Sequence, residues 1–323
     1  MKKFLIIQTA FIGDVILATP LFSELKRIYP EAQIDVLVRK GNQSLLDNNP
    51  HINQVFIFDK KENKVKSILH FIKLFRSKKY DEIINLHRFA STGIITAFSG
   101  SKSTVGFKKN PLSSLFSRKI DHEIGNGKHE VERNLMCIAH HGAVSKLRPE
   151  IFPSTEDFEI VSVYQNEKYF CLAPASVWFT KQLPEHKWIE LGQKLSQKGK
   201  VFIVGGPSDF DICERIKVEI NQENCENLAG KFTFLQSAAL FKSAEMNFVN
   251  DSGPLHFCSA INAPVTAFFC STIPAFGFGP LSENSKTIET EENLSCKPCG
   301  IHGFKNCPKQ HFKCGNLIKI DIV

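Results

Sequence analysis

The sequence predicts an α/β protein of two Rossmann-like domains, each with a parallel sheet, facing each other across a cleft. Three observations support this prediction. The chain has 323 residues, of which 42% are hydrophobic, and this is enough for two domains with a core each. Short apolar runs alternate with segments of helical spacing, and the alternation restarts after about residue 158.

The first half of the chain begins with a βαβ unit. Residues 3–8 resemble a buried strand with apolar residues at 4–7, residues 14–29 have apolar side chains at helical spacing, and residues 33–39 again resemble a strand. The elements expected in the first domain are strands at 3–8, 33–39, 54–59, 82–87 and 103–107 and helices at 14–29 and 64–79. Because strands and helices alternate, we expect a parallel sheet, in a domain that spans residues 1–155.

The second half repeats this architecture. The prolines and acidic residues of 148–158 are typical of a linker, and a second domain is expected over 156–323. Its expected elements are strands at 169–175, 200–206, 246–251 and 264–269 and helices at 185–198, 209–220 and 254–261. In two such domains a ligand binds at the carboxyl ends of the strands, so we expect the site in the cleft.

Charge is unevenly distributed along the chain. Residues 1–150 contain 24 Lys and Arg against 14 Asp and Glu, a balance of +10, whereas residues 151–323 contain 16 against 19, a balance of −3. We therefore expect an anionic partner on the first domain. Most lysines between residues 60 and 79 fit the solvated faces of helices, and no recognised motif indicates a nucleic acid as the partner.

The sequence favours a cytoplasmic protein. Its apolar stretches are too short for a membrane-spanning helix, and the amino-terminal stretch becomes polar at Asp14 before any signal-peptide cleavage site. Six of the ten cysteines are scattered through apolar surroundings, which is typical of reduced core residues.

The turn "NDSGPLH" at residues 250–256 follows an expected strand and opens a helix. Asp251 or Ser252 can cap that helix, Gly253 lets a ligand approach the backbone, and Pro254 suits the first helical turn. The free N–H groups of such a turn attract phosphate. The turn is therefore a candidate diphosphate site, although an acid that merely caps a helix would give the same sequence.

Three other expected strand ends carry glycine or polar residues. Gly13 and Asp14 open the first helix, where a carboxylate can act as a general base or pair with the helix dipole. Lys181 can neutralise a diphosphate or lie on the surface. The candidate nucleotide-binding residues at the other two strand ends are Ser176, Thr180, Gly205 and Gly206.

Together these segments resemble glycosyltransferase family 9, the ADP-heptose:lipopolysaccharide heptosyltransferases. The resemblance covers nearly the whole chain, and the matching segments occur in the family's order: "LIIQTAFIGDVILATP", "HEVERN", "LAPASVWFTKQLPEHKWIEL", "IVGGPSDFD" and "NDSGPLHFCSAINAPVTAFF". It implies a GT-B fold, ADP-heptose as the donor and an anionic lipopolysaccharide core as the acceptor. It also implies catalysis without an obligatory metal.

The resemblance implies roles for particular residues. Asp14 matches the family's proposed catalytic base, and Lys181 matches the lysine of its "TK" segment. The turn that holds the donor's diphosphate matches Asp251, Ser252, Gly253, Pro254 and His256. The Trp usual before the following proline is Leu183 here, which puts the packing of that loop in doubt. Family members tend to have a glutamate soon after the Gly-Gly turn, and the acidic residues at that place in this chain are Asp209 and Asp211.

The expected reaction is an inverting displacement in which Asp14 takes the proton of the attacking acceptor hydroxyl. Lys181 and helix amides neutralise the departing diphosphate, so a metal at the D-x-D pair 209–211 is not expected. The acceptor would lie on the basic first domain and keep the protein at the inner membrane surface as a peripheral protein. The candidate acceptor contacts are Arg88, Lys102, Lys108 and Lys109.

Four cysteines form a group near the carboxyl end, at Cys296, Cys299, Cys307 and Cys314, with His302 and His311 nearby. Cys296 and Cys299 have the tight spacing of a metal site, whereas the spacing of Cys307 and Cys314 is looser than in common zinc ribbons. A structural zinc, an iron–sulfur cluster and four reduced thiols without metal all remain open, and no catalytic role is expected.

Two alternatives to the heptosyltransferase remain. One is a family 9 transferase that uses another nucleotide sugar, such as a UDP-hexosamine, because no residue type here identifies the base or the sugar. The other is a non-catalytic protein that binds a nucleotide sugar. Such a protein would keep the turn at 250–256 but would not need Asp14.

Overall fold

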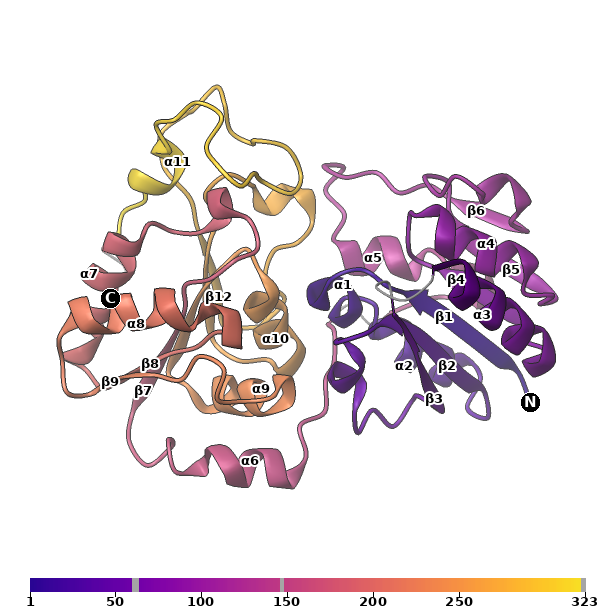
Figure 1. Cartoon of the computed structure of the whole chain (residues 1–323), viewed down its shortest axis with the longest axis horizontal. Helices are drawn as coiled ribbons and strands as arrows, with labels where there is room; N and C mark the ends of the chain where they lie inside the picture. Colours follow the sequence, from indigo (N-terminus) through magenta and orange to yellow (C-terminus); the bar gives the residue numbers. More distant parts are fainter. Residues whose placement is uncertain (60–63, 146–147, 321–323) are drawn as a thin grey trace. The chain divides into compact units, whose positions relative to one another are not determined.

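The computed structural model describes residues 1–59, 64–145 and 148–320. The chain forms two compact units (Figure 1). The first comprises Met1–Ile124 and Lys128–Phe152, and the second comprises Gly125–Gly127 and the chain from Pro153 onward. The predicted boundary at 155/156 lies three residues after the change of unit at 152/153.

The expected linker is partly helical. Helix α6 spans Thr155–Ser162, and the Ser154 side chain caps it by accepting a hydrogen bond from the Asp157 N–H at 3.1 Å. Asp157 in turn accepts a hydrogen bond from the Ser154 N–H at 2.8 Å. This reciprocal capping box explains why a segment that resembles a linker starts a helix.

The first unit contains a six-stranded sheet in which every strand pair is parallel. Its strands, in spatial order, are β3 (Gln54–Phe58), β2 (Gln33–Arg39), β1 (Lys3–Gln8), β4 (Glu82–Asn85), β5 (Ser103–Phe107) and β6 (Arg118–Ile120). Its helices are α1 (Ile12–Ile16), α2 (Pro20–Ile28), α3 (Lys64–Lys78), α4 (Ala90–Phe98) and α5 (Glu130–Leu135). The five predicted strands are confirmed, whereas β6, α4 and α5 were not predicted.

The prediction of one helix over 14–29 is wrong, because the segment forms two helices. The first ends at Ile16, and Pro20 opens the second, where its fixed φ and missing N–H are tolerated. Between them the Thr19 hydroxyl donates to the Ile16 carbonyl at 2.8 Å. Helical spacing continued across the break, so the sequence pattern did not reveal it.

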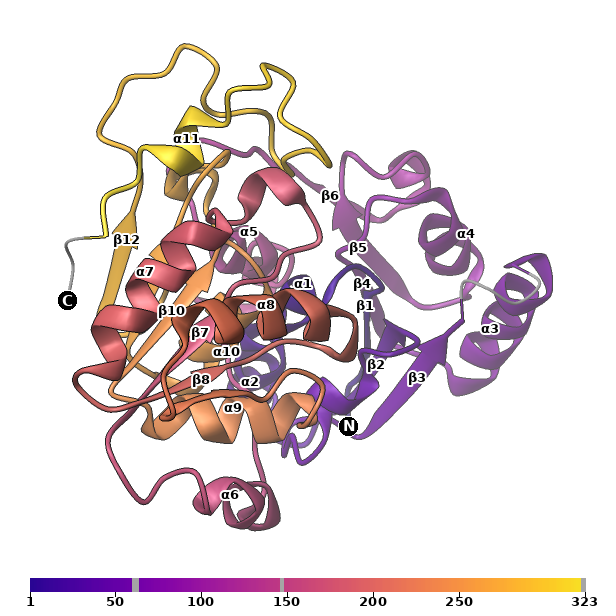
Figure 2. The ribbon, with the colours of Figure 1, turned by 60° about the vertical axis from the view of Figure 1, so that its left-hand side comes forward.

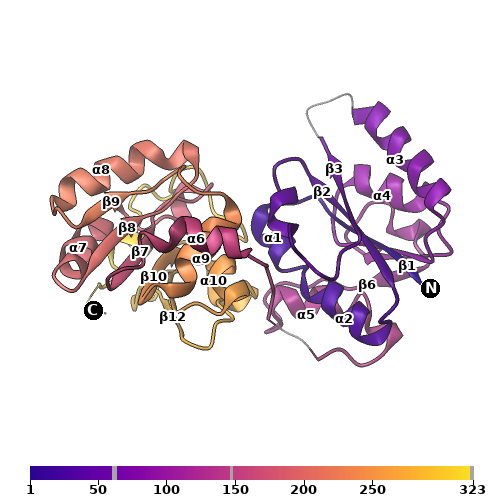
Figure 3. The same cartoon turned by 90° about the horizontal axis from the view of Figure 1, so that it is seen from below.

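Helices cover both faces of the first sheet. Helices α3 and α4 lie on one face, and α2 and α5 lie on the other (Figure 3). Phe71 and Phe75 of α3 pack with Phe56 and Phe58 of β3 in a core cluster. The lysines of α3 point largely to solvent, as expected, while Lys60 and Lys61 lie outside the described residues.

The second unit repeats this plan with a second parallel six-stranded sheet (Figure 2). Its strands, in spatial order, are β12 (Ser285–Ile288), β11 (Val265–Phe268), β10 (Met246–Asn250), β7 (Tyr169–Ala173), β8 (Lys200–Ile203) and β9 (Cys225–Asn227). Its further helices are α7 (Glu185–Ser196), α8 (Phe210–Ile220), α9 (Phe234–Ser243), α10 (Gly253–Ile261) and α11 (Lys313–Asn316). Trp188 of α7 is fully buried against Phe268.

Both sheets have the strand order of a dinucleotide-binding fold. In each, the order reverses between the first and fourth strands, at β1 and β4 in the first unit and at β7 and β10 in the second. Ligands of open α/β sheets bind outside the carboxyl ends of the strands at such a switch point. The residues that follow these four strands are therefore the place to look for function.

Candidate active site

Asp14 lies beyond the carboxyl end of β1, in the first turn of α1. Its Oδ2 atom accepts a hydrogen bond from the Phe11 N–H at 3.0 Å, and the side chain is partly exposed. Burial raises the pKa of Asp14 to about 6, and the negative charge of Glu130 adds to the rise. A carboxylate with this pKa can accept a proton at neutral pH, as a general base must.

A cluster of charged side chains, which we call the Glu130 cluster, lies on the same unit. The Glu130 carboxylate is 2.7 Å from Arg133 Nε and 2.9 Å from His122 Nε2, and Lys109 Nζ lies 2.8 Å from His122 Nδ1. Burial lowers the pKa of Lys109 to about 8, and the charges of Arg88 and Arg133 act in the same direction. The "HEVERN" segment was the only sequence signal for this cluster, and it gave no roles.

The four predicted acceptor contacts do not lie together. Arg88 follows β4 and Lys108 and Lys109 follow β5, so all three lie at the carboxyl edge of the sheet, as Asp14 does. Lys102 precedes β5, and its Nζ is 2.7 Å from Asp81, which precedes β4. In a parallel sheet that is the opposite edge, so Lys102 lies away from Asp14 and its acceptor contact stays a prediction that the geometry does not favour.

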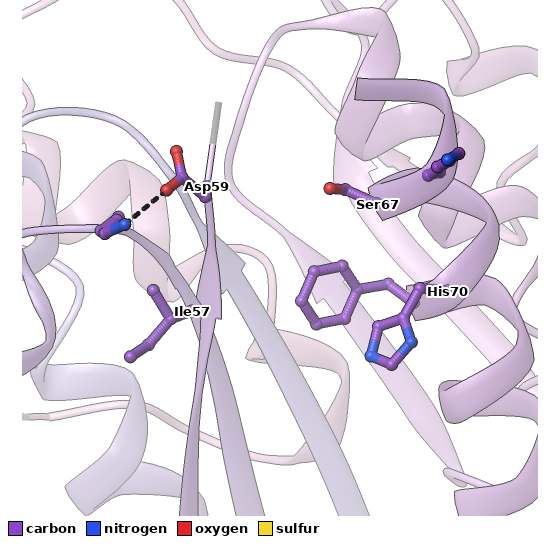
Figure 4. A pocket seen from close by; sticks show the side chains of 7 residues that line it. Ile57, Asp59, Ser67 and His70 are labelled. Atoms are coloured by element: carbon purple, nitrogen blue, oxygen red, sulfur yellow. Dashed lines mark hydrogen bonds and ion pairs between the residues drawn. The ribbon is translucent and has the colours of Figure 1, made fainter. Parts of the chain in front are cut away.

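A pocket of about 480 Å³ opens at the carboxyl edge of β2 and β3. Figure 4 shows Ile57 and Asp59 at the β3 end and Ser67 and His70 on α3, and the pocket is completed by Lys40, Lys66 and Phe71. Lys40 Nζ is 2.7 Å from Asp59 Oδ2. The sequence did not predict this pocket, because its cationic residues come from segments that only the fold brings together.

In the second unit, Lys181 and Asp251 meet at the switch point between β7 and β10. Lys181 Nζ is 2.7 Å from Asp251 Oδ2, and the side chains are only 15% and 6% exposed. The Thr272 hydroxyl donates to the same Oδ2 at 2.6 Å. A carboxylate held in this way repels a diphosphate, so we interpret Asp251 as the residue that positions Lys181.

The turn at 250–256 opens α10 as predicted. Ser252 is the residue before the helix, Pro254 lies in its first turn, and within the described residues no side chain caps the helix. Its first-turn N–H groups and the positive end of its dipole are therefore suited to an anion. His256, in the second turn, is 6% exposed.

The loop after β7 is held by buried polar contacts. Thr180 is 1% exposed, and its Oγ1 accepts hydrogen bonds from the Phe304 N–H at 2.7 Å and the Ser271 hydroxyl at 3.0 Å. The structure thus gives Thr180 a role in holding the loop and does not support the predicted donor contact. Leu183 resolves the doubt about packing, since it is buried in the core cluster and its N–H donates to Asn250 Oδ1 at 2.9 Å.

The other predicted donor-side residues differ in exposure and contacts. Ser176 is partly exposed and lies in the loop after β7. The Gly206 N–H donates to Asp209 Oδ2 at 2.8 Å, so that Asp209 closes the Gly205–Gly206 turn. This amide is thereby taken by the chain itself, and Asp209 acts locally on the turn. Asp211 lies exposed in the first turn of α8.

Cys296, Cys299 and Cys307 lie in a long irregular segment that packs against the loop of Lys181, and Cys314 lies in α11 at the end of that segment (Figure 1). The Thr180 N–H donates to the Phe304 carbonyl at 3.1 Å, and the Cys299 N–H donates to the Ser271 carbonyl at 2.8 Å. Burial raises the pKa of Cys299 and of Cys314, and the neighbouring thiols add to both shifts. The structure does not test the three alternatives for these cysteines, namely a structural zinc, an iron–sulfur cluster and four reduced thiols.

Two parallel-sheet units of Rossmann strand order fit the GT-B fold, and comparison with known proteins shows that the class is a glycosyltransferase. Residues 68–305 match the model of glycosyltransferase family 9 (heptosyltransferase). Lipopolysaccharide heptosyltransferase 3 of Escherichia coli is 29% identical over 294 residues, which is 85% of either chain.

Two solved structures share the fold. The E. coli ADP-heptose lps heptosyltransferase II has a TM-score of 0.79 at 21% identity and covers 98% of each chain. E. coli heptosyltransferase WaaC with ADP-2-deoxy-2-fluoro heptose has a TM-score of 0.72 at 17% identity and covers 92% of this chain and 96% of that one. The chain belongs to glycosyltransferase family 9, which favours an enzyme over a non-catalytic binding protein.

Proposed function

We propose that this chain transfers heptose from ADP-heptose to the inner core of lipopolysaccharide, with Asp14 as the general base. The observation that carries this proposal is the carboxylate of Asp14, partly buried at the switch point of the first sheet, with its pKa raised to about 6. The names of the relatives support the choice of substrates. One is a lipopolysaccharide heptosyltransferase, and another was solved with an ADP-heptose analogue.

The proposed step is a single displacement with inversion at the anomeric carbon. The acceptor oxygen forms its bond to that carbon as the bond to the diphosphate oxygen breaks, and Asp14 takes the acceptor proton. The departing ADP carries the bonding electron pair away. Lys181 and the first-turn amides of α10 neutralise the charge that develops on it, and Asp251 holds Lys181 in place. No divalent cation is needed in this scheme.

The acceptor side of the proposal rests on the basic first unit. Arg88, Lys108 and Lys109 lie at the same sheet edge as Asp14, and the pocket of Lys40 and Lys66 lies at that edge too. An anionic lipid A core sugar would be attracted to these cations. We propose a cytoplasmic protein that lies peripherally on the inner membrane, where such acceptors are found. No helix in the described part of the chain is long and apolar enough to span a membrane.

The test is a transfer assay with ADP-heptose and a heptose-deficient lipopolysaccharide core, run with and without EDTA. We expect transfer that survives EDTA and that falls by at least about a thousandfold in Asp14→Asn, since both general-base catalysis and acceptor orientation are lost. UDP-N-acetylglucosamine serves as the competing donor. Transfer from that donor alone would reject the heptose assignment, and full activity of Asp14→Asn would reject the assignment of the base.

A further inference from the structure

A second cluster of potential ligands lies on the first unit, away from the candidate active site. Glu82 is the first residue of β4, and His140 and His141 lie in the short 3₁₀ turn Ala139–His141. His141 Nε2 is 2.7 Å from Glu82 Oε1, and His140 Nε2 is 3.1 Å from Glu82 Oε2. Because Asp14 follows a strand of this parallel sheet and Glu82 starts one, the two lie at opposite edges.

The three side chains are largely removed from water. The side chains of Glu82, His141 and His140 are 5%, 9% and 19% exposed. Two imidazoles and a carboxylate that contact one another with little water around them offer the nitrogen and oxygen ligands that zinc takes from proteins.

From this geometry we propose that Glu82, His140 and His141 form a binding site for a zinc ion. Each residue offers one ligand atom, and these atoms all lie within 4.8 Å of one another. Two imidazole nitrogens and a carboxylate oxygen are a common zinc set, with bonds of about 2.0–2.2 Å. Tetrahedral bonds of that length place two ligand atoms roughly 3.3 Å apart. At present His141 Nε2 lies 2.7 Å from Oε1 of Glu82 and His140 Nε2 lies 3.1 Å from Oε2, so the ligand atoms are already gathered and the side chains must shift slightly to surround an ion.

Neighbouring residues already orient the ligands. The Tyr29 hydroxyl lies 3.2 Å from His141 Nδ1, the nitrogen that faces away from Glu82. When the hydroxyl oxygen accepts a hydrogen bond from Nδ1–H, Nε2 is left with a lone pair for the metal. The rings of Phe4 and Tyr29 pack edge-on against the same imidazole, with centroids 5.4 and 5.5 Å away. Tyr29 and Phe4 therefore fix the orientation of the His141 imidazole.

The position of the site indicates a structural role. The turn that carries both histidines follows α5, whereas Glu82 belongs to the central part of the sheet, next to β1. A bound ion would tie that turn to the sheet by three bonds and neutralise the buried carboxylate. It would not take part in the transfer reaction, because Asp14 lies at the other edge of the sheet.

Equilibrium dialysis of metal-free protein against Zn²⁺ tests the proposal, with His140→Ala and Glu82→Gln as variants and the exposed His186→Ala as the matched control. We expect both variants to bind one equivalent fewer per chain than the wild type and the control. Zn²⁺ should raise the thermal midpoint of the wild type more than that of His140→Ala. Because His140 is the most exposed ligand, its replacement should leave the fold intact.

The cysteines of the carboxyl-terminal segment are a competing source of bound metal, and Co²⁺ separates the two. Cobalt bound by thiolates gives intense near-ultraviolet charge-transfer bands, whereas cobalt bound by nitrogen and oxygen does not. We expect His140→Ala to lose one equivalent of cobalt without any change in those bands. We also expect Tyr29→Phe to weaken that equivalent about 10–100-fold. Equal zinc stoichiometry in wild type, His140→Ala and Glu82→Gln would overturn the proposal.

Discussion

At the scale of single residues, Asp14 shows how a local environment prepares a carboxylate for chemistry. The sequence identified the residue but left two interpretations, a general base or an acid that pairs with the helix dipole. In the structure its Oδ2 accepts a hydrogen bond from the Phe11 N–H at the start of α1 and so caps that helix. The same carboxylate is also desolvated and lies within the field of Glu130, and this raises its pKa. No sequence pattern could reveal that field, because Glu130 is 116 positions away along the chain.

The raised pKa predicts the acid limb of the activity profile. If Asp14 is the base, kcat/KM should fall about tenfold for each pH unit below about 6, because the protonated carboxyl cannot accept a proton. A carboxyl with an ordinary pKa near 3.8 would keep activity two units further into acid. Initial rates at saturating donor, measured from pH 4.5 to 8, distinguish the raised pKa of Asp14 from the ordinary one. A profile flat down to pH 5 would contradict the assigned environment.

The raised pKa of Asp14 also predicts that its ionised carboxylate lowers the free energy of unfolding at neutral pH. A carboxyl whose pKa rises from 3.8 to about 6 on folding has no cost below pH 3.8, an increasing cost up to about pH 6 and its full cost above that. Asp14→Asn should therefore be more stable than the wild type at pH 7, by roughly 1–3 kcal/mol, with the difference vanishing near pH 4. Urea unfolding at both pH values measures it. A less stable variant at pH 7 would show that Asp14 contributes mainly as a cap.

At the scale of elements, strands were easier to predict than breaks between helices. The strands predicted at 3–8 and 33–39 coincide with β1 and β2, since strands buried on both faces are rich in apolar residues. Short elements such as β6, with three residues, carry too little pattern to be detected. The loop of Lys181 depends on contacts with Phe304 and Ser271, far along the chain, so its conformation could not be derived locally.

A pair of glycines in the carboxyl-terminal segment tests whether that segment holds the loop of Lys181. Gly303, at φ +73°, has Thr180 Oγ1 only 2.8 Å and Lys181 Cγ 3.2 Å from where a Cβ would stand. Gly300, at φ +79°, has open space there. Gly303→Ala should displace the loop and raise the donor KM several-fold. Both variants have a backbone cost of about 1 kcal/mol, so Gly300→Ala is the matched control. Equal donor KM values would show that the segment does not support the site.

At the scale of the whole molecule, the sequence predicted that the parallel sheet is repeated. It did not show at which edge of the first sheet each candidate lysine lies. Residues 1–150 have a charge balance of +10, from which we expect an anionic partner, and Lys102 and Lys109 are both candidate acceptor contacts on the sequence alone. In a parallel sheet, however, residues before a strand and residues after it lie at opposite edges. Lys102 and Lys109 are seven positions apart along the chain, and β5 separates them.

These two lysines distinguish a general attraction by net charge from recognition at one edge. Lys102→Ala and Lys109→Ala each remove one positive charge from the same unit. If only the overall field mattered, both would raise the acceptor KM equally, and added salt would abolish the effect. We expect Lys109→Ala to raise it about tenfold, the size of one lost charge-assisted contact, and Lys102→Ala to leave it unchanged. The Lys109 contribution should also fade above about pH 8 in the wild type, since its lowered pKa lies there and the ammonium is lost as the pH rises. Steady-state kinetics with varied acceptor at 50 and 200 mM salt would measure the acceptor KM of both variants. Equal increases for the two substitutions would show that overall positive charge, and not a contact at one edge, attracts the acceptor.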